Sequence, residues 1–104
     1  MRETAALATQ MGVPLEDNPP LNLVKTIAAV SEQQAVETLR ETGTIMGSRA
    51  PTHRMSSLQD VERGRRLEVE ETLGYVVTQA GEQGILVPTV ETCYRLISGL
   101  NRFV

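Results

Sequence analysis

The stretch from Ser56 to Glu71 holds the densest group of polar side chains in the 104-residue sequence. Ser56 and Ser57 stand at the predicted start of one helix, and Glu68 and Glu70 stand at the predicted start of the next. A helix start offers open N–H donors and a partial positive charge, so it can hold a carboxylate or an oxyanion. A neighbouring carboxylate can accept a hydrogen bond from a hydroxyl group. Together these groups would suit a small hydroxy or keto acid.

The same residues also fit ordinary structural roles. Ser56 and Gln59 are spaced as in a capping box, in which the Ser56 hydroxyl accepts from the backbone N–H of Gln59. Glutamates at a helix start complement the helix dipole. The basic turn between the two predicted helices, residues 63–66, has no interleaved aromatic residue. It is therefore typical of a solvated turn rather than of a nucleic-acid surface.

Single residues limit the remaining chemistry. The sequence has one cysteine, Cys93, and one histidine, His53, which excludes an internal disulfide and zinc sites built from several of these side chains. Cys93 lies among apolar residues at helical spacing and is predicted to be an inert core thiol. His53 is predicted to lie in a loop. Because the sequence has no Gly-x-Gly-x-x-Gly turn after a strand and no phosphate-binding loop, we expect no cofactor site in this chain by itself.

The composition indicates one helical domain, residues 1–104, with an aliphatic core. Hydrophobic residues make up 40% of the sequence, but aromatic residues make up only 3% and Trp is absent. The net charge of −3 gives no general attraction to nucleic acid or anionic lipid. No stretch has the apolar length of a signal peptide or a membrane span. We therefore expect a cytoplasmic protein that binds neither nucleic acid nor membranes.

Apolar spacing predicts helices along nearly the whole chain. The predicted helices are 4–11, ending at Gly12; 21–39, with a possible break near Ser31; 56–64; 68–84; and a last one capped by Thr89 that runs to Leu100. Gly43, Gly47 and Pro51 predict an irregular stretch, and residues 85–88 predict a loop tucked into the core. Glu91 and Arg95 are spaced for an i, i+4 ion pair. The predicted architecture is all-α, with five or six helices.

The segment from Ser56 to Glu70 resembles the signature of ketopantoate reductases and their relatives. That signature has Ser, a few residues, Leu-Gln-Asp, a spacer, Gly-Arg, and then Glu-Ile/Val-Asp/Glu. Further matches lie at the family's next glycine, its Gly-Val-Pro-Thr-Pro segment and its final helix: Gly74, residues 84–88 and Tyr94. The resemblance is specific from Ser56 to about Leu100, looser over residues 1–14, and only generally helical over residues 15–54.

This resemblance implies an all-α C-terminal domain of the 6-phosphogluconate-dehydrogenase-like type, without a Rossmann domain. In that family an N-terminal Rossmann domain binds NADPH, and ketopantoate is reduced to pantoate on the pantothenate route to coenzyme A. The helical domain supplies the substrate side of the cleft. Ser56 matches the family's substrate-binding serine. Glu68 matches its active-site glutamate, which contacts the substrate hydroxyl.

Departures from the family pattern affect the expected activity. The family's general-acid lysine would lie upstream of Met1, and Lys25 is not its equivalent. Leu73 stands where many relatives have asparagine, and Arg66 replaces a proline. We therefore expect the chain alone to be inactive, with NADP(H) and a 2-keto acid such as ketopantoate bound only in an intact enzyme that includes the missing Rossmann domain. The alternative is a non-catalytic helical interaction module that forms a homodimer or binds another protein through the surface left uncovered.

Overall fold

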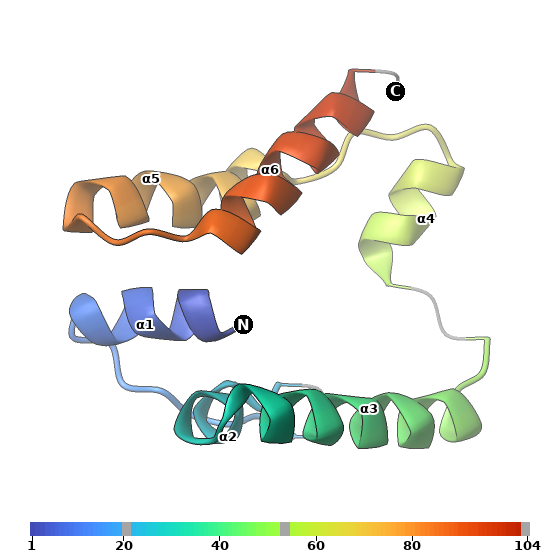
Figure 1. Ribbon diagram of the computed structural model, residues 1–104. Coiled ribbons are helices and arrows are strands. Elements are labelled where there is room, and N and C mark those ends of the chain that lie inside the picture. The colour runs from blue at the N-terminus through green and yellow to red at the C-terminus, as the bar shows by residue number, and fades with distance from the viewer. Residues whose placement is uncertain (20–21, 53–54, 103–104) are drawn as a thin grey trace. The chain divides into compact units, whose positions relative to one another are not determined.

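The computed structural model describes residues 1–19, 22–52 and 55–102 (Figure 1). These residues form six α-helices and one π-helical turn, and the one strand-like pairing among them is an isolated bridge between Asn18 and Asn22. The all-α prediction is confirmed. None of the described helices is both long enough and apolar enough to span a membrane. The chain divides into two compact units, Met1–His53 and Arg54–Val104, which are described separately below.

The first unit consists of α1 (Arg2–Gln10), α2 (Val24–Ala29) and α3 (Glu32–Arg49). Helix α1 packs against α2, and α2 packs against α3. The buried side chains are small or aliphatic: Ala5, Leu7, Ile27 and Ala35. Gly12 follows α1 with φ of 76°, a left-handed conformation that suits glycine, so the predicted end of the first helix is confirmed.

The start of α2 is capped by a side chain from the preceding loop. The Asp17 carboxylate accepts hydrogen bonds from the backbone N–H groups of Lys25 and Thr26, at 2.8 and 3.1 Å, and from the Thr26 hydroxyl. Leu23, at the N-cap position, has no side-chain oxygen with which to accept these bonds. The Thr26 hydroxyl is the main cause that lowers the pKa of Asp17. Asp17 therefore fastens the loop to the helix while ionised.

The break between α2 and α3 lies near Ser31, as predicted. Val30 has an extended backbone, and the Ser31 hydroxyl caps α3 by accepting from the N–H of Gln34 at 3.2 Å. The Arg2 guanidinium donates to the Val30 carbonyl at 2.6 Å and so ties α1 to this break.

The prediction of an irregular stretch at Gly43 and Gly47 is wrong, because α3 runs through both glycines to Arg49. A glycine inside a helix costs only about 1 kcal/mol relative to alanine, which neighbouring helical residues can offset. The helix ends where Pro51 disfavours helical geometry in the preceding residue, and Ala50 there has φ −140° and ψ 65°.

The second unit consists of α4 (Ser56–Glu62), the π-helical turn η1 (Glu70–Gly74), α5 (Tyr75–Gln83) and α6 (Pro88–Asn101). The turn η1 packs against both α5 and α6, and α5 packs against α6. Their buried hydrophobic side chains are Val69, Ala80, Val87 and Val90. Gly84 ends α5 with φ of 69°, as predicted, whereas Gly81 lies inside the helix.

Three details of the last helix and of the loop before it differ from the predictions. Helix α6 begins at Pro88 with Val87 at its N-cap position, so Thr89 lies inside the helix rather than capping it. Leu86 is 89% exposed and Val87 only 5%, so the loop buries one aliphatic side chain and leaves the other out. Cys93 is exposed and is not a core thiol.

The predicted pair on α6 is confirmed, with Arg95 Nη2 2.9 Å from Glu91 Oε1. His53 lies outside the described residues.

Candidate functional site

Ser56 is the first residue of α4, and Met55 occupies the N-cap position with φ −67° and ψ 151°. The backbone N–H of Gln59 donates to the Met55 carbonyl at 3.1 Å. The N-cap position is therefore one residue earlier than predicted, the side chain there does not cap the helix, and the assignment of Ser56 as the N-cap is wrong. Ser56 is exposed at the N-terminal end of α4.

Glu68 lies in the connection between α4 and η1, two residues before the π-helical turn begins. It is not the first residue of a helix, as predicted; Glu70 and Glu71 stand in the first turn of η1 instead. The Glu68 side chain is exposed, and the described part of the chain gives its carboxylate neither a hydrogen bond nor an ion pair. Glu68 and Ser56 lie in the same unit, but no described contact joins them.

The backbone just before Glu68 is held by α6. The Asn101 side-chain amide accepts from the N–H of Leu67 at 2.8 Å and donates to the carbonyl of the same residue at 3.2 Å. Both bonds are part-buried and join positions 34 residues apart in sequence. Because one amide group satisfies both backbone groups, the position of Leu67 against the end of α6 is well defined.

The residues just after Glu68 are held through their side chains. Val69 is buried, and the next residue, Glu70, accepts from the Tyr94 hydroxyl of α6, with its two carboxylate oxygens 2.8 and 2.9 Å from Tyr94 Oη. The hydrogen bond to Glu70 is the main cause that raises the pKa of Tyr94, with desolvation and the carboxylate charge adding to it. The protonated phenol is thus the form that this contact favours.

Gly74 leaves the space that this pair occupies. A Cβ atom at Gly74 would lie 2.7 Å from Glu70 Oε2, 3.1 Å from the Tyr94 ring and 3.3 Å from the Val69 carbonyl oxygen. The backbone conformation of Gly74 is an ordinary helical one, so close packing rather than φ requires glycine here. Its N–H donates to the Val69 carbonyl at 2.8 Å, five residues back, which is the hydrogen bond of a π-helical turn.

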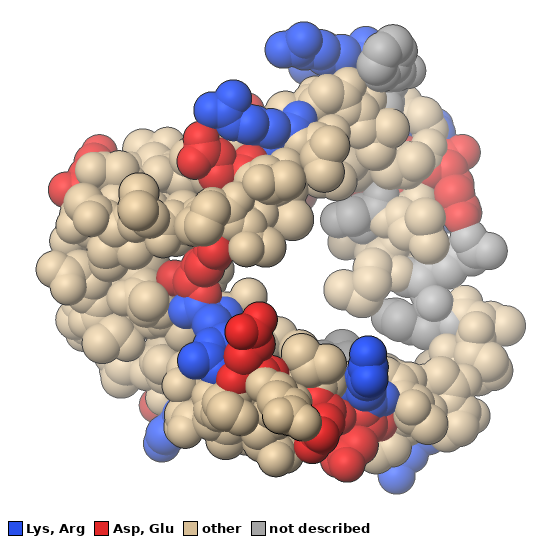
Figure 2. All heavy atoms as spheres, viewed as in Figure 1, with Lys and Arg blue, Asp and Glu red and all other residues tan. Residues whose placement is uncertain are grey.

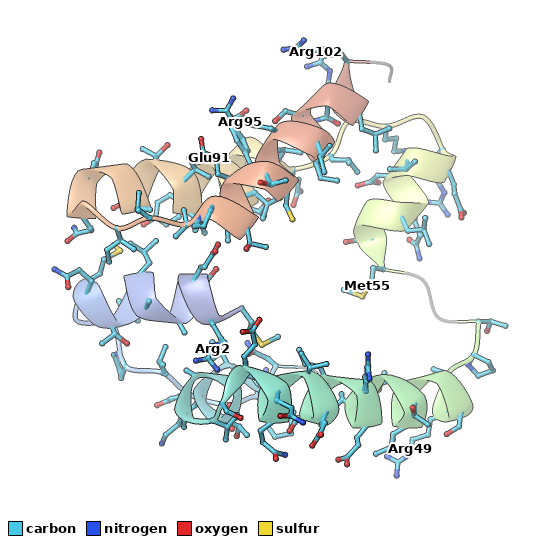
Figure 3. All side chains as sticks on the ribbon, in the orientation of Figure 1. Arg2, Arg49, Met55, Glu91, Arg95 and Arg102 are labelled. Atoms are coloured by element: carbon cyan, nitrogen blue, oxygen red, sulfur yellow. The ribbon has the colours of Figure 1, made fainter. Side chains whose placement is uncertain are left out.

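A groove of about 740 Å³ lies beside the Glu70–Tyr94 pair. It is lined by charged residues that include Arg66, Glu70, Glu91, Arg95 and Arg102, together with Tyr94, Ser98 and Asn101. Figure 3 shows Glu91, Arg95 and Arg102 in succession along α6. In Figure 2, basic and acidic side chains lie next to one another over this helix. Both acids are engaged, Glu70 by Tyr94 and Glu91 by Arg95, and Glu68 is not among the lining residues.

Sequence reasoning missed the contacts that Tyr94 and Asn101 make. The available signal was their spacing: positions 94 and 101 are seven residues apart, so both lie on one face of a helix. Polar side chains on the otherwise apolar face of the last helix indicate a specific partner. The described residues contain no group of three His, Cys, Asp or Glu side chains that could hold a metal ion.

Similarity to known proteins gives the family of the chain. No curated protein and no solved structure matches the sequence significantly. The sequence model of the family described as "Ketopantoate reductase PanE/ApbA C terminal" matches residues 1–101. The match covers most of both compact units, including Glu68 and all of α6. The chain therefore belongs to the C-terminal domain family of ketopantoate reductases.

Proposed function

We propose that the chain is the substrate-side domain of an NADPH-dependent ketopantoate reductase-like enzyme, which reduces ketopantoate or a related 2-keto acid to the 2-hydroxy acid. The observation that carries the proposal is the state of Glu68. Helix α6 bonds to the Leu67 backbone before it and to the Glu70 side chain after it, while the Glu68 carboxylate is exposed and has no partner among the described residues. This arrangement suits a carboxylate that contacts a ligand.

The proposed roles follow from the chemistry of the two side chains. The Glu68 carboxylate, when ionised, only accepts hydrogen bonds, so it would bind the hydroxyl group of the hydroxy acid. The Ser56 hydroxyl both donates and accepts, so it would bind the polar end of the same molecule. Lys25 is not assigned the general-acid role, because the family's lysine precedes the segment that residues 1–14 resemble, whereas Lys25 follows it.

NADP(H) would supply the hydride in such an enzyme. The described residues form no strand followed by a glycine-rich turn and a helix, the structure that holds the pyrophosphate of a dinucleotide in a Rossmann domain. They therefore do not fit this cofactor, and we assign its binding to a Rossmann domain outside this sequence. In the proposed enzyme, the chain alone does not turn over ketopantoate.

Titration of the isotopically labelled chain with pantoate, followed by NMR, tests the proposal. We expect shifts of the Ser56 and Glu68 amide signals. Replacing Glu68 by Gln should weaken binding at least about tenfold, because hydrogen bonds to charged groups contribute about 1.5–3 kcal/mol. Glu71→Gln, which neutralises a nearby exposed acid, is the matched control and should bind as the original chain does. Equal affinities of the two variants, or ketopantoate-dependent NADPH oxidation by the pure chain, would contradict the proposal.

A second candidate function is a non-catalytic interaction module. The observation in its favour is the exposure of two large leucines of the second unit, Leu86 at 89% and Leu96 at 68%. Contiguous exposed apolar patches are typical of surfaces that associate, and in this candidate function the two leucines would belong to such a patch. Sedimentation over a range of concentrations tests this function: association that Leu96→Glu abolishes and Thr92→Glu, an exposed polar position on α6, leaves intact would support it. A clean monomer at high concentration would exclude self-association as this function.

A further inference from the structure

Helix α6 contacts the chain on both sides of Glu68, through the backbone of Leu67 and the side chain of Glu70. Asn101 bonds to Leu67 through both polar groups of its amide, at 2.8 and 3.2 Å. Tyr94 bonds to Glu70 at 2.8 and 2.9 Å. Between these contacts, Val69 is 3% exposed. Of residues 67–70, Glu68 and Glu70 are exposed, but Glu70 is paired with Tyr94, whereas the Glu68 carboxylate has no hydrogen bond or ion pair among the described residues.

We propose that Asn101 and Tyr94 are positioning residues that hold the backbone of Glu68 so that its carboxylate meets the substrate in one place. The inference rests on the proposed function, because it assigns these two residues their role through Glu68. A carboxylate on a mobile connection would lose conformational freedom on every binding event. A carboxylate on a backbone fixed beforehand avoids that loss, which raises affinity and orients the group.

The side-chain types at these two positions fit the role. An asparagine amide carries a donor and an acceptor, so it can pair with the N–H and the C=O of one residue, as a neighbouring strand would. Aspartate could accept from Leu67 N–H but could not donate to its carbonyl. The tyrosine hydroxyl donates to Glu70 while its ring packs beside Gly74. Phenylalanine would keep the ring and lose only the hydrogen bond.

The positions that make these contacts lie far from Glu68 in sequence. Asn101 is 34 residues from Leu67, and Tyr94 is 24 residues from Glu70. Because α6 is a regular helix packed on η1 and α5, it can support the non-helical connection that carries Glu68. Local propensity of residues 65–69, which form no regular helix, could not supply this order.

Backbone ¹⁵N relaxation of the full 104-residue chain measures the inferred effect directly. We expect a rigid Glu68 amide, with an order parameter near about 0.85, that falls below about 0.6 in Asn101→Ala. Tyr94→Phe, which keeps the ring, should loosen the same amide to a smaller extent, and Asn101→Asp should fall between Asn101→Ala and the original chain. Asn22→Ala is the matched control: Asn22 accepts from Val24 N–H in the other unit, so its loss should leave Glu68 unchanged.

Pantoate titration of the same variants separates the inference from the proposed function. Support requires that Asn101→Ala, still folded by circular dichroism, weakens pantoate binding about as much as Glu68→Gln does, while Asn22→Ala does not. An unchanged Glu68 order parameter in both Asn101→Ala and Tyr94→Phe overturns the inference, whatever the affinities of these variants for pantoate. Undiminished affinity in Asn101→Ala, with affinity lost in Glu68→Gln, also overturns the inference but leaves the proposed function standing. A Glu68→Gln variant that binds as Glu71→Gln does overturns the proposed function, and the positioning role with it.

Discussion

Gly74 is the residue whose replacement tests the packing of the site most directly. A methyl group there would meet the Glu70 carboxylate, which can swing away, and also the Tyr94 ring and the Val69 carbonyl, which are held by the helices. We therefore expect Gly74→Ala to lower the free energy of unfolding by about 1–3 kcal/mol, the usual cost of overpacking. Denaturant unfolding followed by circular dichroism measures this change.

Gly81→Ala provides the control for that substitution. Gly81 lies inside α5, and a Cβ atom there would have no neighbour within 4 Å. Alanine at such a position should stabilise the chain by about 0.4–1 kcal/mol through the lower entropy of the unfolded state. If Gly74→Ala were as stable as Gly81→Ala, the described packing of Glu70, Tyr94 and Gly74 would be wrong.

The Tyr94–Glu70 contact should make stability depend on alkaline pH. The pKa of Tyr94 is raised above 10.0 in the folded chain, so the protonated phenol is favoured on folding. The contribution of this contact is fully present below pH 10 and is lost as the pH rises through the folded pKa. We expect the Tm of the original chain to fall more steeply above pH 10 than that of Tyr94→Phe.

Ultraviolet absorbance of tyrosinate gives an independent measurement of the same effect. In a Tyr75→Phe background, Tyr94 is the one tyrosine left, because the sequence has two. Its titration should shift to lower pH when Glu70 is replaced by Gln, since the carboxylate that favours the protonated phenol is then neutral. A titration that does not respond to this replacement would show that the two groups do not interact in solution.

At the scale of single elements, α2 should depend on the ionised Asp17 carboxylate. Its pKa is lowered from 3.8, so its contribution to stability is present above that pH and is lost as the pH falls through the folded pKa. Asp17→Asn should therefore lower the Tm at neutral pH and flatten its dependence on acidic pH. Glu16→Gln, at the exposed neighbouring acid, is the control and should retain the steep acid limb.

The sequence predicted most of the helices because their apolar spacing and turn residues agree. Gly12, Ser31 and Gly84 mark ends or starts of helices in the structure as they do in the sequence. The glycines of α3 were misleading, since a glycine lowers helix stability without ending a helix. Cys93 was misleading because it stands next to the buried face of α6 in the helical pattern, yet the thiol itself is exposed.

The candidate site was less predictable than the helices. Ser56 and Glu68 were found through a family signature, and their roles stay predictions. The partners of the neighbouring segment were not found, because Asn101 and Tyr94 meet it across 34 and 24 residues of chain. Helical periodicity reports which face of a helix is apolar, but it does not report which backbone groups a polar side chain on that face will meet.

At the scale of the whole molecule, we propose that residues 1–104 unfold as a single domain. Each compact unit has about fifty residues and, among those described, only four buried hydrophobic side chains. A unit of about 60 residues is already marginal because it buries too little of its surface. We therefore expect one calorimetric transition whose calorimetric and van't Hoff enthalpies agree. Two separate transitions would show instead that each unit folds independently.

The π-helical turn η1 also sets the direction in which the residues before it face, relative to α5 and α6. Each residue of an α-helix turns the chain by about 100°, and the hydrogen bond from Gly74 back to Val69 accommodates one residue more than a regular turn would. Deleting a single residue from η1 would leave α5 and α6 to pack as before but rotate everything upstream by about that angle. Leu67 would then be turned out of line with Asn101, its partner on α6. A one-residue change at this turn would thus leave the helices folded and yet point Glu68 in the wrong direction.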